Sequence, residues 1–144
     1  MPRGVWVRDP DRGGTPIPPA VQQRTAQRIR SYAERHLPGK STRLEVRFKK
    51  QFCYIDAFTE PYVPKRWPPP GWPDPHETRA ERVERLRHTP THLCRLRYFG
   101  DEDRWSFAMF GYSNEKYELT ILPSGDFFGT PEEACAAVVE ACLS

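Results

Sequence analysis

The chain has 144 residues, of which 38% are hydrophobic and 12% aromatic, and this length fits one domain with a single core. Residues 1–100 hold 20 of the 22 Lys and Arg but 10 of the 19 Asp and Glu (+10), whereas residues 101–144 hold the other 2 bases and 9 acids (−7). This division indicates an anionic partner, or two oppositely charged surfaces that meet each other or another protein. Because the sequence has no apolar run of signal-peptide or membrane-spanning length, we expect a cytoplasmic protein without membrane contact.

The N-terminal part predicts an arm, a helix and a hairpin. Residues 1–18 are rich in Pro, Gly and Asp and predict an extended arm. A helical pattern follows over residues 19–37, and Pro38-Gly39 ends it. From residue 43 the apolar period becomes two, which predicts a hairpin over residues 43–59 with its turn near residues 49–51. The apolar face of the helix consists of Val21, Ile29, Tyr32, Ala33 and Leu37, and the inward side of the first strand of Leu44, Val46 and Phe48.

Residues 60–90 form an insertion of different composition. Seven prolines lie between residues 61 and 75, together with Trp67 and Trp72, and proline excludes this stretch from the interior of a sheet. We expect an extended surface segment there, followed by a charged, exposed helix within residues 76–88. The two tryptophans either pack back on the sheet as a strap or serve as a linear ligand for a groove on a protein partner.

The last third predicts a three-stranded meander and a helix. Strands are expected at residues 93–99, 104–112 and 117–122, within a meander over residues 91–123 that Pro123-Ser124-Gly125 ends. Thr130-Pro131-Glu132-Glu133 then opens a helix over residues 130–143 with a capping box. The whole chain, residues 1–144, therefore predicts one α+β domain. Its antiparallel, meander-like sheet of about five strands would be flanked by N- and C-terminal helices.

Three blocks of this sequence, Asp103–Ala108, Tyr112–Glu118 and Pro123–Ala134, resemble a group of small bacterial proteins of unknown function. The resemblance covers roughly residues 43–58 and 90–135. It implies no activity, cofactor or site residue for this chain.

Catalytic and metal sites find little support in the residue patterns. Four side chains, those of Cys53, His88, His92 and Cys94, supply metal-ligand types, but their spacing matches no common zinc pattern. Asp56 lies in an otherwise apolar strand, and we expect a nearby arginine to pair with it. No nucleophile elbow or phosphate-binding glycine loop is present. We therefore expect no catalytic residue, no metal and no cofactor, and an enzyme of unrecognised type ranks third among the functions.

Basic residues give the leading functional hypothesis. Alternation places one set outward on two strands, and a second set follows one face of the N-terminal helix. The expected nucleic-acid-binding residues are Arg24, Arg28, Arg35, Arg43, Arg47, Lys49, Arg95 and Arg97. Such a surface suits weak contact with a nucleic-acid backbone, unless the acidic C-terminal third neutralises it internally. A protein-interaction role is the alternative, with Trp67 and Trp72 as partner-binding residues, and the opposite charges also allow head-to-tail self-association.

Overall fold

The structure is a computed structural model that describes residues 9–37, 42–73 and 76–143, and the expected arm before residue 9 and Pro38-Gly39 lie outside these ranges. The described residues form one α+β domain with three α-helices and a six-stranded antiparallel sheet. The sequence predicts this fold class, with about five strands. In chain order the elements are α1 (Pro19–His36), β1 (Thr42–Lys49), β2 (Phe52–Thr59), α2 (Arg79–Arg87), β3 (Thr91–Tyr98), β4 (Trp105–Gly111), β5 (Lys116–Leu119), β6 (Phe128–Gly129), α3 (Pro131–Val138) and a π-helical turn (Val139–Leu143).

Sequential hairpins build the sheet in the order β1-β2-β3-β4-β5. The turn between β1 and β2 has two residues, since Lys49 pairs with Phe52, and Lys50 adopts a left-handed φ of 55°. The expected turn is therefore confirmed although no glycine marks it. One strand was not expected: after the Pro-Ser-Gly turn the chain returns as β6, and Gly129 pairs with Trp105 of β4.

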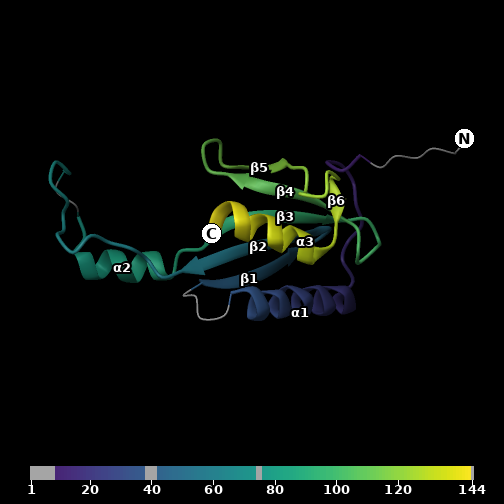
Figure 1. Cartoon of the computed structure of the whole chain (residues 1–144), viewed down its shortest axis with the longest axis horizontal. Coiled ribbons are helices and arrows are strands. Elements are labelled where there is room, and N and C mark those ends of the chain that lie inside the picture. Colours follow the sequence, from purple (N-terminus) through teal and green to yellow (C-terminus); the bar gives the residue numbers. More distant parts are fainter. Residues whose placement is uncertain (1–8, 38–41, 74–75, 144) are drawn as a thin grey trace, which may run out of the picture.

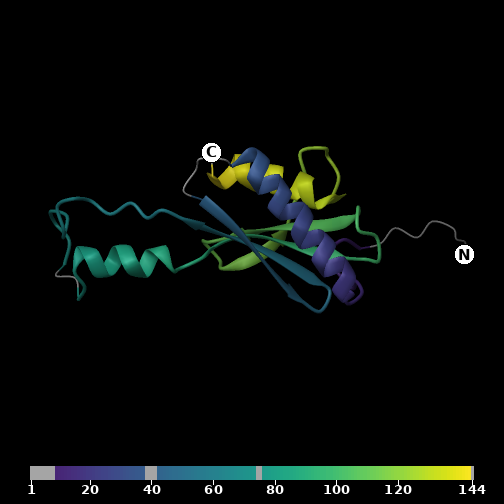
Figure 2. The ribbon, with the colours of Figure 1, turned by 90° about the horizontal axis from the view of Figure 1, so that it is seen from below.

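The helices α1 and α3 cover the same side of the sheet. Figures 1 and 2 show α1 and α3 on one face, and the opposite face, which we call the open face, carries no helix within the described residues. The strand residues that alternate toward the helices make the core, and Trp105 and Phe107 are fully buried there. The core also contains Leu44, Cys53, Ile55, Cys94 and Leu96 from the sheet, Val21 and Ile29 from α1, and Ala134, Cys135 and Val138 from α3.

Cysteines belong to this core rather than to a reactive site. Cys53, Cys94 and Cys135 are buried, and burial raises the pKa of the Cys135 thiol to about 12 and that of Cys53 further still. A thiol with so high a pKa supplies no thiolate at neutral pH. The side chain of Cys142 lies outside the described ones.

Two helices begin with the same capping arrangement. Thr130 accepts a hydrogen bond from the Glu133 amide, and the Glu133 carboxylate accepts one from the Thr130 amide, as the sequence predicts for α3. Thr78 and Glu81 repeat this capping box at the start of α2. α2 confirms the expected charged helix in the insertion, and no residue of α2 is fully buried.

The insertion projects from the domain and does not cover the sheet. Described residues 60–73 contain no helix or strand, as expected, and they run beside α2 away from the strands (Figures 1 and 2). Trp67 donates from Nε1 to the Glu77 carbonyl oxygen at 3.0 Å and packs against Trp72 and the Arg82 guanidinium. The strap expectation is therefore wrong, because α2 of the insertion itself supplies the packing surface for the tryptophans. Among the described residues, no helix is long and apolar enough to cross a membrane.

Candidate functional site on the open face of the sheet

The open face carries aromatic rings and guanidinium groups that lie next to one another. Strand alternation directs Leu44 and Leu96 into the core, so their neighbours point to the other side. Cross-strand pairing then places Arg47, Tyr54 and Arg95 in one row across β1, β2 and β3. The outward orientation expected for the strand bases is confirmed.

A continuous series of ring contacts crosses this face, and we call it the aromatic track. Tyr54 contacts Phe52 with ring centroids 5.9 Å apart and Tyr117 at 5.4 Å. Tyr117 contacts Phe110 at 4.9 Å, and Phe110 contacts Tyr112 at 4.6 Å. All of these rings are at least partly exposed, and Tyr112 is 57% exposed. Burial and the Asp56 carboxylate raise the pKa of Tyr117 to about 12, so its hydroxyl adds no negative charge at neutral pH.

Arg95 and Arg97, the arginine pair, lie two positions apart on β3, and both stack on Phe52. The guanidinium carbons lie 4.4 Å (Arg95) and 4.7 Å (Arg97) from the centroid of that ring, and Arg95 also lies 5.3 Å from the Tyr117 ring. Neither guanidinium forms a salt bridge with a carboxylate of the described residues. Burial, followed by the charge of Arg95, lowers the pKa of Arg97, and the charges of Asp11 and Asp9 on the N-terminal arm oppose this shift only in part. The negative charge of an anion bound here would offset both effects.

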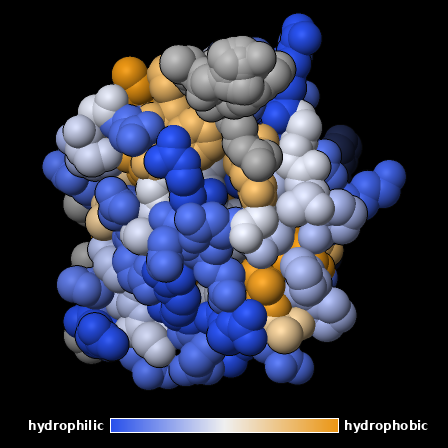
Figure 3. Space-filling view, turned by 90° about the vertical axis from the view of Figure 1, so that its right-hand side faces the viewer, coloured by the Kyte–Doolittle hydropathy of each residue, from blue (hydrophilic) through white to orange (hydrophobic). Residues whose placement is uncertain are grey.

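The N-terminal arm meets this face at the end of the β1–β2 hairpin. The Arg97 Nη1 donates to the Gly13 carbonyl oxygen at 2.9 Å, and the Thr15 amide donates to the Tyr98 carbonyl oxygen at 2.9 Å. Gly14 has a φ of 102°, and a Cβ there would lie 2.6 Å from the Tyr98 carbonyl oxygen, so the close approach of the arm requires glycine. Figure 3 views the molecule from this end, where the surface is largely hydrophilic.

Asp56 is buried in the open face and has two partners there. Its side chain is 4% exposed, and its oxygens accept from Arg47 Nε at 2.8 Å and lie 2.9 Å from His92 Nδ1. The expected arginine partner is thus Arg47. The imidazole partner was not expected, because it depends on a β-bulge in β3. The ring of His92 packs against Phe110 at 5.2 Å, which joins this cluster to the aromatic track.

The bases of α1 lie on the other side of the sheet, and two of the three expected there, Arg24 and Arg28, are paired with carboxylates. Arg24 forms a two-bond contact with the Glu102 carboxylate at 2.8 and 2.9 Å. Arg28 does the same with Glu132 at 2.8 and 2.7 Å and also pairs with Asp103 at 2.9 Å. These carboxylates belong to the acidic C-terminal third, so internal pairing explains part of the charge division. Arg35 is exposed near Glu132.

The expected basic residues therefore do not converge on one surface. On the open face, Arg43 pairs with Glu45 at 3.2 Å and lies over the Phe58 ring, whereas Lys49 is exposed. Together with Arg47, Arg95 and Arg97 they form the strand set, which strand alternation directs to the open face, whereas α1 covers the opposite face of the sheet (Figure 2).

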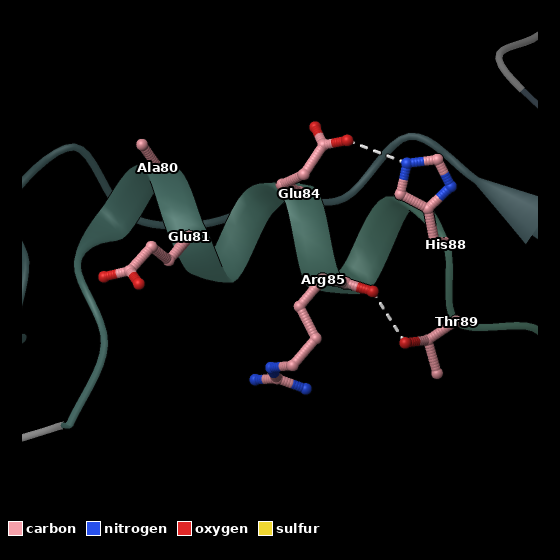
Figure 4. Close-up of a pocket in the computed structure, with 6 residues that line it drawn as sticks. All are labelled: Ala80, Glu81, Glu84, Arg85, His88 and Thr89. Atoms are coloured by element: carbon pink, nitrogen blue, oxygen red, sulfur yellow. Dashed lines mark hydrogen bonds and ion pairs between the residues drawn. The ribbon is translucent and has the colours of Figure 1, made fainter.

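Other candidate chemistry is dispersed. Cys53 and Cys94 point into the core while His92 lies on the open face, and His88 belongs to the end of α2. Among the residues that the structure describes, no group of three or more metal-ligating side chains gathers. A shallow depression on α2, lined by Ala80, Glu81, Glu84, Arg85, His88 and Thr89, holds a local Glu84–His88 contact of 2.7 Å (Figure 4). Its charged side chains are paired with other residues of the insertion, among them Arg85 with Glu77, and do not converge on a ligand position.

Two features of the open face were not predicted from the sequence: the ring contacts of the aromatic track, and the alignment of aromatic side chains along one side of β2. The contact of Tyr54 on β2 with Tyr117 on β5 depends on the pairing of β2 with β3 across the insertion, which no local pattern encodes. Alternation over residues 52–58 does place Phe52, Tyr54, Asp56 and Phe58 on one side, and that signal was available.

No protein family, curated protein or solved structure matches this chain.

Proposed function

We propose that this chain binds single-stranded nucleic acid on the open face of its sheet. The observation that carries the proposal is the arginine pair: two neighbouring guanidinium groups stack on one ring, and neither forms a salt bridge with a carboxylate of the described residues. A guanidinium group without a salt bridge can bind a phosphate, whose oxygens accept two hydrogen bonds from one arginine.

The aromatic track favours a single strand over a duplex. Unstacked bases pack on exposed rings and on guanidinium planes, and such stacking tolerates any sequence. In a duplex the base faces are covered by their neighbours, so the rings of the track would have no partner. Arg24 and Arg28 are left out of the proposed interface because carboxylates already bind them.

Fluorescence anisotropy with a labelled polypyrimidine single strand tests this function. The double variant Arg95→Gln/Arg97→Gln should weaken binding at low salt by at least about tenfold. It should also reduce the log–log salt slope by about 1.4, or about 0.7 for each lost phosphate contact. Thermal melting of the variant shows whether the fold is retained.

Arg30→Gln/Arg35→Gln is the matched control, because it removes the same charge from exposed positions of α1. This control should bind like the unaltered chain. If no strand binds at low salt, or if both double variants lose affinity equally, the open face is not the binding surface. Tighter binding of duplex than of single strand would refute the role of the aromatic track.

Partner binding by the projecting insertion is the second candidate function. Tyr62 is 87% exposed and Trp72 is 52% exposed, which is unusual for large rings. Trp67 is turned onto α2, so it positions the segment rather than facing a partner. A chain without the insertion that still binds nucleic acid but loses a protein partner in pull-down experiments would assign the two functions to different parts of the molecule.

A further inference from the structure

We infer that His92 accepts a hydrogen bond from the ribose 2′-hydroxyl, so that the open face prefers RNA to single-stranded DNA. This inference rests on the proposed function. It follows from the position of His92, from its hydrogen bond to Asp56 and from its place at the end of the aromatic track.

A β-bulge sets the position of His92. Between β2 and β3, Ile55 pairs with Cys94, and in an unbroken register Asp56 would pair with Leu93. The bulge instead turns Leu93 into the core, where it is 1% exposed, and places His92 directly opposite Asp56. Bulges re-aim side chains in this way and are frequent beside functional sites.

The buried carboxylate fixes the tautomer of the imidazole. Asp56 accepts from Arg47 at one oxygen, and its other oxygen lies 2.9 Å from His92 Nδ1. Because an ionised carboxylate only accepts, Nδ1 carries the proton, and in the neutral ring Nε2 then holds a lone pair. Nε2 has no hydrogen-bond partner among the described residues, and the His92 side chain is 37% exposed.

In the neutral ring Nε2 is an acceptor and does not pair with a phosphate, because phosphate oxygens are acceptors as well. The donors that a nucleic acid offers are base amino and imino groups and the 2′-hydroxyl. The 2′-hydroxyl recurs at every nucleotide of RNA whatever its sequence, which suits a face that binds by stacking and charge. DNA lacks this group.

Ring contacts connect His92 to the arginine pair, so that one bound strand can reach both. His92 contacts Phe110, Phe110 contacts Tyr117, and Tyr117 lies under Arg95. His92 is three residues from Arg95 on β3, which is about 10 Å along a strand. A strand whose phosphate binds Arg95 therefore brings a neighbouring ribose toward His92.

The test compares the affinities of RNA, DNA and 2′-O-methyl RNA of one sequence. One added hydrogen bond predicts that RNA binds about three- to tenfold more tightly than DNA. The methylated strand has no hydroxyl donor and should bind like DNA. His92→Asn retains a donor near the position of Nδ1 for Asp56 and removes Nε2. This variant should bind DNA normally and lose the preference for RNA.

Arg95→Gln/Arg97→Gln is the matched control, since it should weaken RNA and DNA by the same factor and leave their ratio unchanged. Equal binding of RNA and DNA by the unaltered chain overturns the inference while leaving the proposed function intact. So does a ratio that survives His92→Asn, a methylated strand that binds like RNA, or a preference for amino-bearing bases in both RNA and DNA. Failure of every strand to bind overturns the proposed function and this inference together.

Discussion

Replacing Arg28 by alanine should destabilise the domain without affecting nucleic-acid binding. The Arg28 side chain is 28% exposed and joins α1 to α3 and to the β3–β4 turn. It donates two hydrogen bonds to Glu132 at 2.8 and 2.7 Å and a third to the Glu102 carbonyl oxygen at 3.0 Å. The partner carboxylates of Glu132 and Asp103 are 40% and 71% exposed, so water weakens the contribution of both pairs.

We expect a loss of about 1–2 kcal/mol in the free energy of unfolding, because one two-bond contact in a partly buried position is removed. For a domain of this size that loss lowers the melting temperature by about 3–6 °C. Urea denaturation and thermal melting measure the two quantities. Arg30→Ala, on the same helix but exposed and without a carboxylate partner in the described structure, should change stability by no more than about 0.5 kcal/mol.

The loss of stability in Arg28→Ala should also depend on pH. The hydrogen bond from Arg28 is the main cause that lowers the pKa of Glu132 below its ordinary 4.5. A carboxylate with a lowered folded-state pKa stabilises the fold above its unfolded pKa and ceases to do so as the pH falls through the folded value. The stability difference between the unaltered chain and Arg28→Ala should therefore be full near pH 6 and shrink below about pH 4.5. Equal melting of Arg28→Ala and Arg30→Ala, or a gap that stays constant in acid, would refute the structural role of this pair.

The remaining predictions concern the helix cap and the insertion. Thr130→Ala should lower the free energy of unfolding by about 1 kcal/mol in urea denaturation. Thr130→Ser retains a capping hydroxyl and should stay near the unaltered value. An equal loss in both variants would show that the capping hydrogen bond contributes nothing. Replacing residues 61–89 by a short Gly-Ser linker should leave the melting of the sheet and nucleic-acid affinity unchanged, because α2 packs on the proline-rich part of the same insertion and Ala57 already pairs with Thr91. A drop of several degrees would instead show that the insertion supports the sheet.

Local sequence patterns determined the elements of this protein. The capping box at Thr130, the period-two alternation from residue 43 and the proline cluster at residues 61–75 each act over a few neighbouring residues, so the helices, the hairpin and the irregular insertion follow from them. The orientation of Arg95 and Arg97 also follows, because strand alternation fixes the side to which each residue points. The missed strand β6 has two residues, too few for a periodic signal.

Tertiary structure decided which charges are neutralised and which remain available. Arg28 and Glu132 are separated by 104 positions in the chain, and their contact exists because α1 and α3 pack on the same face of the sheet. Asp56 meets His92 because a bulge shifts the register by one residue, and Phe52 lies under two arginines because β2 and β3 are neighbours. Sequence composition counts these charges, but pairing energies depend on distance and burial, which only the folded chain sets.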